Sequence, residues 1–377
     1  MLKLTENRII YLDYLRALAI IGIVCCHGSA MYFYGNTKIL NNFNVSFFVT
    51  FFTCGRFIGI PLFVMISGAL LINKHYSIRE FFTKRLNRIL VPFVFWVIIY
   101  MLFAKFILHK PLISNYTLDL IYGESGTIGV IFWFIWMILI VYIGIFLINK
   151  IIEYGSKKYK GFDKKFIKIL IIISLMIYIM IDFGIIPSIP SDLWANILYI
   201  PYALFGYYLY NLKLEDLKFL KKYKINSRHI IISTLLISLI GYTFYVYYVV
   251  IESMKLNTFT ADTYFQIIVM IFNFAIFLFF KNLSYYGEKY FKKFYNLVYS
   301  KSIKEITYSI SKCSFGIYFI HYVLVRFIMK VILKGTDYKH HPIFWIPILI
   351  ITVFLVSWGL TLTLSKIPFI KRFSGFY

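Results

Sequence analysis

Three ionisable side chains lie inside one apolar stretch near the start of the chain: Asp13, Arg16 and His27. A charge within a membrane costs a few kcal/mol or more, so it usually faces the protein interior and serves a function. Arg16 and His27 are eleven residues apart, almost three helical turns, which predicts one shared face with roughly 16 Å between them. Asp13 precedes Arg16 by one turn and can pair with it.

This face could support acyl transfer. An imidazole can take the proton of an attacking hydroxyl, or it can carry the acyl group as a nucleophile; the sequence leaves both roles open for His27. Arg16 can position an anionic donor or stabilise developing negative charge. The simpler alternatives are that Arg16 is a membrane anchor paired with Asp13, and that His27 is a packing residue hydrogen-bonded between helices.

A second group of candidates is basic. Lys84, Arg85 and Arg88 follow the second apolar stretch. A guanidinium group binds phosphate through two parallel hydrogen bonds, and Arg85 and Arg88 share a face if this segment is helical. They could therefore hold a phosphate-bearing cosubstrate. The alternative is that these charges only fix the orientation of the chain in the membrane.

The elements that position these residues are apolar segments long enough to cross a bilayer. The 377 residues are 60% hydrophobic and only 15% charged, and their mean hydropathy is +0.77. Each segment approaches the roughly 20 residues that a spanning helix needs. We predict an all-α, polytopic membrane helix bundle with a single domain over residues 1–377. Its ten expected spans are 9–31, 46–72, 91–109, 128–152, 168–186, 194–212, 229–252, 263–281, 306–331 and 344–365.

The charge distribution predicts the orientation of this bundle. The net charge is +24, but the basic residues cluster in short loops between apolar segments, on every second loop. This pattern is typical of cytoplasmic loops, so we expect both termini in the cytoplasm and no nucleic-acid partner. The four cysteines follow neither a disulfide nor a zinc pattern, and no metal site is expected.

Five segments, in this order, resemble the membrane-bound acyltransferase family 3. They are LDYLR with His27 eleven residues after its arginine, RFIGIPLFVMISG (56–68), RLNRILVP (85–92), FWF (132–134) and SFGIYFIH (314–321). The third segment is similar to the family's RxxR loop, and the fourth has Phe where the family has Leu. The chain ends soon after its last expected span, as in the compact members without an appended hydrolase-like domain.

The resemblance implies an acyl-CoA-dependent O-acyltransferase in a bacterial plasma membrane. It would move an acyl group, with acetyl-CoA as the expected donor, to a cell-surface glycan or a lipid-linked glycan precursor, and it implies no metal. Four further residues are candidates for substrate contacts: Arg56, Trp133, Tyr318 and His321. Each has a simpler alternative, since Arg56 can extend towards the outer surface and the other three can be packing residues.

Two further points stay open. Pro61 and Gly68 predict a bend or a close backbone approach in the second span. Ten helices with interior charges also suit a transporter or flippase of glycan or acyl units, although the paired interrupted repeats of such proteins are not evident here. The acceptor, O- or N-acylation, and the oligomeric state cannot be read from the sequence.

Overall fold

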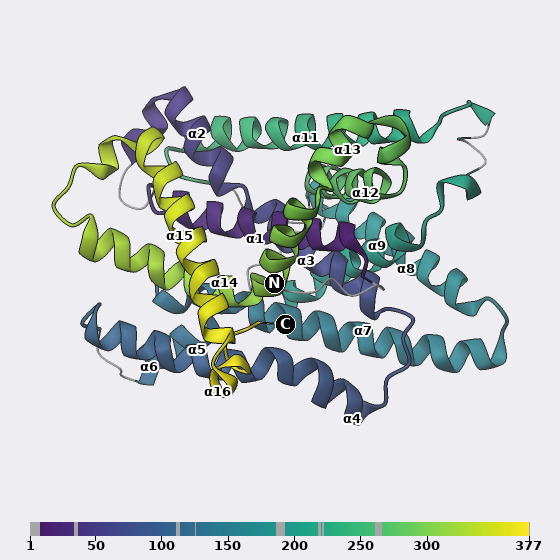
Figure 1. Cartoon of the computed structure of the whole chain (residues 1–377), viewed down its shortest axis with the longest axis horizontal. Helices are drawn as coiled ribbons and strands as arrows, with labels where there is room; N and C mark the ends of the chain where they lie inside the picture. Colours follow the sequence, from purple (N-terminus) through teal and green to yellow (C-terminus); the bar gives the residue numbers. More distant parts are fainter. Residues whose placement is uncertain are drawn as a thin grey trace.

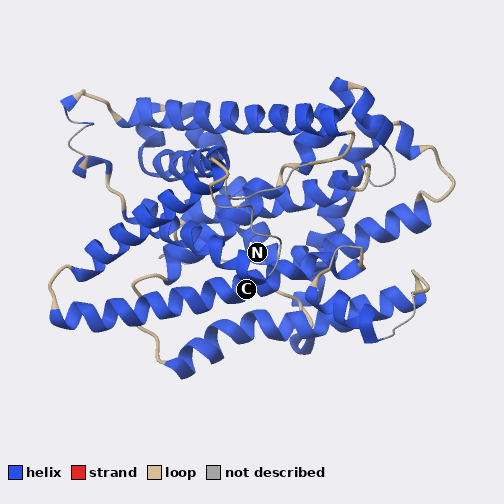
Figure 2. Ribbon diagram, turned by 180° about the vertical axis from the view of Figure 1, so that it is seen from behind, coloured by secondary structure: helices blue, strands red, loops and turns tan. Residues whose placement is uncertain are grey.

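The computed structural model describes residues 8–33, 37–110, 114–124, 126–185, 193–217, 220, 222–260 and 266–376. All regular structure in these residues is helical, with short 3₁₀ and π segments, and they contain no strand (Figure 2). Segments in lipid must satisfy their backbone hydrogen bonds internally, which helices do. The predicted all-α membrane bundle is confirmed.

Eight helical segments in the described residues are long and apolar enough to cross a membrane. They are α1 (Ile10–Ala30), α2 (Phe43–Thr53) with α3 (Arg56–Leu71), α4 (Ile78–Phe81) with η2 (Phe82–Leu86) and α5 (Asn87–Phe106), η3 (Ile128–Phe132) with α7 (Trp133–Lys158), α11 (Ser227–Leu256), α12 (Ile267–Tyr290), α14 (Lys301–Phe327) with η6 (Ile328–Ile332), and α15 (Pro342–Ser365).

The two other predicted spans are helical as well, but they do not meet the same criteria. Residues 168–186 fall largely on α8 (Phe162–Asp182), which begins with several lysines. Residues 194–212 fall on η4 (Leu193–Tyr199) and α9 (Ile200–Asn211), and α9 alone has 12 residues. The count of ten therefore stays a prediction. The cytoplasmic position of both termini also stays a prediction.

The third span begins earlier than predicted. The expected start was residue 91, yet the helix runs continuously from Ile78. Ser77 and Glu80 explain the difference, since they form a capping box: the Glu80 backbone N–H donates to Ser77 Oγ at 3.2 Å, and the Ser77 N–H donates to the Glu80 carboxylate at 3.3 Å. This cap starts the helix before the basic residues, so Lys84, Arg85 and Arg88 are helical.

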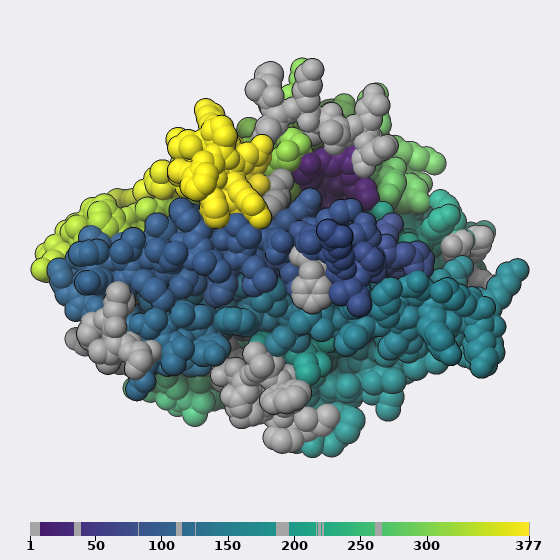
Figure 3. Space-filling view, turned by 90° about the horizontal axis from the view of Figure 1, so that it is seen from below, coloured from purple at the N-terminus to yellow at the C-terminus, as the bar shows by residue number. Residues whose placement is uncertain are grey.

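Helix α1 lies at the centre of the bundle, where it packs against α2, α3, α12, α14 and α15. In Figure 1, α11 lies along one edge of the molecule and α5 and α7 lie along the opposite edge. Figure 3 shows that opposite face, with the yellow C-terminal segment beside the blue residues of α5.

Helix α14 runs parallel to α1, because Asp13 contacts Ser311 and His27 contacts His321. We call the Asp13 end, predicted to be cytoplasmic, the inner end and the opposite end the outer end.

The second predicted span is broken at Cys54 and Gly55, and Pro61 lies inside the helix α3 that follows the break. A Cβ atom on Gly55 would lie 2.5 Å from the carbonyl oxygen of Gly22 in α1, so the two backbones touch there. The close approach predicted at Gly68 is confirmed: a Cβ atom at this position would lie 1.9 Å from the carbonyl oxygen of Ala203 in α9. Helices α1, α3 and α9 thus form one closely packed layer.

Pro61 stays inside α3 because another helix repairs its missing hydrogen bond. Proline has no N–H, so the carbonyl of Phe57, four residues earlier, loses its usual donor. The side-chain amide of Asn273 in α12, which is fully buried, donates to this carbonyl at 2.8 Å. This bond allows α3 to continue past the proline.

A buried lysine ends α9 in a similar way. The Lys281 ammonium of α12 donates to the carbonyls of Leu209, Tyr210 and Leu212, at 2.7, 2.8 and 2.6 Å. These carbonyls belong to the last turn of α9, which has no further residues to pair with them. A positive charge at a helix C-terminus also interacts favourably with the helix dipole.

Candidate functional site

A cavity of about 540 Å³ opens between helices at the inner end of the bundle. Its walls come from α1, α3, η2, α5, α7 and α14, so distant parts of the sequence meet there. Five of its lining residues are cations and one is a carboxylate. They are Arg8, Arg16, Arg85, Arg88 and Lys312, with Asp13. The cavity therefore carries an excess of positive charge and suits an anionic ligand.

Asp13 holds the α1 side of this cavity in place. Its carboxylate accepts hydrogen bonds from Arg8 at 2.5 and 2.7 Å, and from the hydroxyl of Ser311 at 2.7 Å. The predicted pairing with Arg16 is present but longer, at 3.4 Å. Asp13 is only 4% exposed, so these contacts compensate for the burial of its charge. One carboxylate shared by two guanidinium groups leaves net positive charge in the cavity.

The basic segment contributes two of its three predicted residues. Arg85 and Arg88 line the cavity, and Arg85 donates to the hydroxyl of Tyr76 at 2.7 Å. The π-helical turn of η2 joins directly to α5, and this continuous helix carries both arginines to the same cavity. Lys84 does not line it. Its exposed ammonium group lies 3.0 Å from the Glu80 carboxylate, on the surface.

Two histidines meet near the outer end of α1. The rings of His27 in α1 and His321 in α14 lie 5.2 Å apart, centroid to centroid, and the ring of Tyr322 lies 5.0 Å from His27. His321 Nδ1 lies 3.1 Å from the carbonyl oxygen of Ile317, an acceptor, so Nδ1 carries the proton. His321 Nε2 then holds a lone pair, and it has no hydrogen-bond partner in the described part of the chain.

Arg56 also belongs to this outer group. It is the first residue of α3, just after the break at Gly55, and its guanidinium interacts electrostatically with the His27 imidazole. The contact between Gly22 and Gly55 brings the start of α3 against α1 and so accounts for this position. Among the predicted substrate-contacting residues, Arg56 and His321 are therefore the two beside His27.

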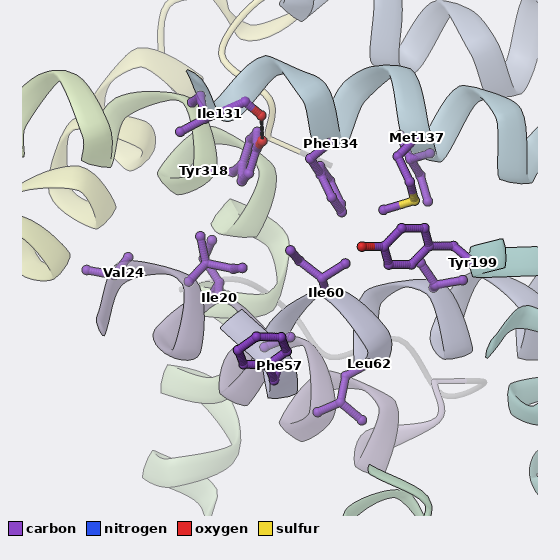
Figure 4. Packing of buried hydrophobic residues seen from close by; sticks show 14 of the residues in the cluster. Ile20, Val24, Phe57, Ile60, Leu62, Ile131, Phe134, Met137, Tyr199 and Tyr318 are labelled. Carbon is purple, nitrogen blue, oxygen red and sulfur yellow. Dashed lines mark hydrogen bonds between the residues drawn. The ribbon is translucent and has the colours of Figure 1, made fainter. Parts of the chain in front are cut away.

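Tyr318 lies between the cavity and the histidines. It lines the cavity, its ring centroid is 5.8 Å from that of His321, and its hydroxyl donates to the carbonyl of Ile131 (Figure 4). Trp133 does not line the cavity. Its ring instead faces Tyr199 at 6.2 Å, and the next residue, Phe134, reaches the cavity from the same motif.

Several cavity residues were not among the sequence candidates. Arg8 and Lys312 look like ordinary flanking charges, and Phe63 and Phe134 are two of 40 phenylalanines in the chain. A partial signal exists for Lys312, because Ser311, Lys312 and Ser314 make one turn of α14 polar inside the expected span 306–331. Across the described residues, no group of three or more His, Cys, Asp or Glu side chains could hold a metal ion.

The comparisons with known proteins agree with the resemblance seen in the sequence. A family model described as an acyltransferase domain, that of acyltransferase family 3, matches residues 9–362, which include every residue of the cavity and of the histidine pair except Arg8. Neither the curated proteins nor the solved structures contain a match to the chain. The match spans essentially the whole sequence, and the chain belongs to the acyltransferase 3 family of membrane acyltransferases.

Proposed function

We propose that this acyltransferase moves an acyl group, expected to be acetyl, from cytoplasmic acyl-CoA to a hydroxyl of a cell-surface glycan or its lipid-linked precursor in a bacterial plasma membrane. The observation that carries this proposal is the arrangement of charges: a cationic cavity at the inner end, and two imidazoles beyond its deep end. Donor and acceptor would thus reach the reaction from opposite sides of the membrane.

The inner cavity suits acyl-CoA because this donor has several phosphate charges at one end and an uncharged thioester at the other. Arg85 and Arg88 on one wall, and Arg8 and Lys312 on another, can bind phosphate oxygens with charge-assisted hydrogen bonds. The deeper walls are largely apolar and suit the thioester arm. The donor would therefore bind with its acyl group pointing towards the outer end.

In this proposal His27 accepts the proton of the acceptor hydroxyl. The hydroxyl oxygen forms a bond to the thioester carbonyl carbon, the carbon–sulfur bond breaks, and the thiolate of CoA takes up a proton to leave as the thiol. Arg56 can orient the acceptor beside His27, and Arg16 the donor. Transient acylation of His27 is the alternative route, and it gives the same products.

The outer end of the bundle offers a place for the glycan. A surface groove of about 520 Å³ lies between the start of α2 and the start of α15, and its lining includes Asn42, His340 and His341. These side chains can hydrogen-bond to sugar hydroxyls. Helices α2 and α15 both pack against α1, which carries His27.

The proposal can be tested with protein purified in lipid nanodiscs and with membranes from cells that produce it. Labelled acetyl-CoA should release free CoA thiol and place alkali-labile label in the membrane glycans. His27→Ala should abolish both signals, and His75→Ala, which changes an exposed loop histidine, serves as the matched control. Equal labelling by a folded His27→Ala variant would remove His27 from the mechanism. Glycan movement across the bilayer without acyl-CoA would indicate a transporter instead.

A further inference from the structure

Aromatic side chains close the deep end of the inner cavity. Helices α3 and α7 run from the outer to the inner end and α14 runs the opposite way, so the outermost cavity residue on each is Phe63, Phe134 and Tyr318, respectively. The remaining cavity residues on these helices lie closer to the inner end. We call Phe63, Phe134 and Tyr318 the aromatic wall.

The three rings of the aromatic wall are packed against one another. The centroids of Phe63 and Phe134 are 6.1 Å apart, and those of Phe134 and Tyr318 are 5.0 Å apart. Figure 4 shows Tyr318 and Phe134 side by side, with the Tyr318 hydroxyl bonded to the backbone of Ile131. This bond fixes the Tyr318 ring, because the carbonyl of Ile131 belongs to the buried η3 segment.

Tyr318 connects the aromatic wall to the histidine pair. His321 follows Tyr318 by less than one turn of α14, and their ring centroids are 5.8 Å apart. His27 lies beyond His321, and neither histidine lines the cavity. A ligand that enters from the inner end with its charged groups among the arginines therefore meets these rings with its leading, uncharged end.

We propose that Phe63, Phe134 and Tyr318 are specificity-determining residues that restrict the donor to short acyl chains. This inference rests on the proposed function, which places the acyl group of acyl-CoA at the leading end. The thioester carbon must approach His27, and the acyl chain moves ahead of it. Every carbon of the acyl chain therefore has to fit among the side chains of the aromatic wall, which already touch. Close-packed protein interiors accommodate added methylene groups poorly. Discrimination by one methylene group in an apolar pocket is roughly 10–200-fold.

The test measures kcat/KM for acetyl-CoA and butyryl-CoA, by release of CoA thiol, in nanodiscs. The wild-type protein should prefer acetyl-CoA by about 100-fold or more, since butyryl has two additional methylene groups. Phe63→Ala and Phe134→Ala should reduce this ratio to less than tenfold, chiefly through faster use of butyryl-CoA. Phe244→Ala, which removes an exposed phenylalanine of α11, is the control and should keep the wild-type ratio.

Tyr318→Phe removes the hydroxyl and keeps the ring, so this variant should keep most of the preference for acetyl-CoA over butyryl-CoA. Should either alanine variant fail to fold, Phe63→Leu and Phe134→Leu remove less volume and should shift the ratio in the same direction by a smaller factor. A wild-type enzyme that uses butyryl-CoA as well as acetyl-CoA would overturn the inference, as would alanine variants with an unchanged ratio. A wild-type protein that uses neither thioester would overturn the proposed function itself.

Discussion

The rings of His27 and His321 lie 5.2 Å apart, although the two residues come from opposite ends of the chain. The proton of His321 is on Nδ1, bound to the carbonyl of Ile317, which leaves Nε2 as an unpartnered acceptor within the described structure. An acceptor at this position can fix the tautomer of a neighbouring imidazole or share its proton. The two imidazoles are thus close enough to act together in the proposed acyl transfer.

His27→Ala should lower kcat by about 10²–10⁴-fold, the usual contribution of a general base. His321→Ala should lower it by a smaller factor, because it removes only the neighbour of the base. The measurement is thiol release from acetyl-CoA in the presence of acceptor membranes, with His75→Ala as the control. An alanine variant at residue 321 that is less active than the one at residue 27 would reverse the assignment of the two histidines.

Asp13→Asn should destabilise the protein by about 3–5 kcal/mol, the cost of breaking a buried ion pair by removing one partner. The loss arises because Arg8 and Arg16 would lose their common anion. Ser311→Ala removes only one hydrogen bond to this carboxylate, and should cost about 1.5–3 kcal/mol. Thermal unfolding in detergent would compare the two variants. A Ser311→Ala variant as unstable as Asp13→Asn would mean that the ion pairs of Asp13 with Arg8 and Arg16 add no stability beyond the hydrogen bond to Ser311.

Arg85→Lys should raise the KM for acetyl-CoA by roughly 10-fold or more, because an ammonium group cannot form the paired hydrogen bonds of a guanidinium. The same should hold for Arg88→Lys if both arginines bind donor phosphate. Lys84→Ala is the neighbouring control, since this ammonium lies on the surface next to Glu80. The opposite order, with Lys84→Ala more harmful than either arginine variant, would place the donor outside the cavity.

Asn273→Leu should destabilise α3 by about 1–3 kcal/mol, the cost of removing the donor from a buried hydrogen bond. In this variant the carbonyl of Phe57 loses the Asn273 amide, and residue 61 cannot donate in its place because it is proline. Pro61→Ala restores the backbone N–H, so the double variant Pro61→Ala/Asn273→Leu should recover most of the lost stability.

The control for this rescue is Asn282→Leu. Asn282 lies in the same helix and is equally buried, but its amide donates to the carbonyl of Leu278 in its own helix. Pro61→Ala should therefore not rescue Asn282→Leu. Equal rescue of both asparagine variants would show that Pro61→Ala stabilises α3 in general and that Asn273 does not compensate for the proline.

Much of the fold followed from local sequence properties. Apolar segments of membrane-spanning length predict helices because lipid offers no other hydrogen-bond partners, and the charged residues inside the first segment predict an interior face. The ion pair between Asp13 and Arg16 could also be predicted, because it depends only on helical spacing. The start of α4 could have been predicted from the Ser77 and Glu80 capping box.

The remaining features depend on packing between distant segments. Arg8 precedes α1 and reaches Asp13 across a non-helical stretch, so no helical spacing reveals this pair. The contact of His27 with His321, the repair of Pro61 by Asn273, and the aromatic wall each require the relative placement of two or more helices. A single sequence does not contain that placement in any local pattern.

The backbone contacts of Gly22 with Gly55 and of Gly68 with Ala203 leave no room for sliding between α1, α3 and α9. These three helices pack backbone against backbone, and two of them carry Arg16, His27 and Arg56. The helices on the opposite side of the cavity, α5 and α7, meet it through larger and more deformable side chains. We therefore expect entry of a bulky donor to displace α5 or α7, and α1 and α3 to keep their positions relative to one another.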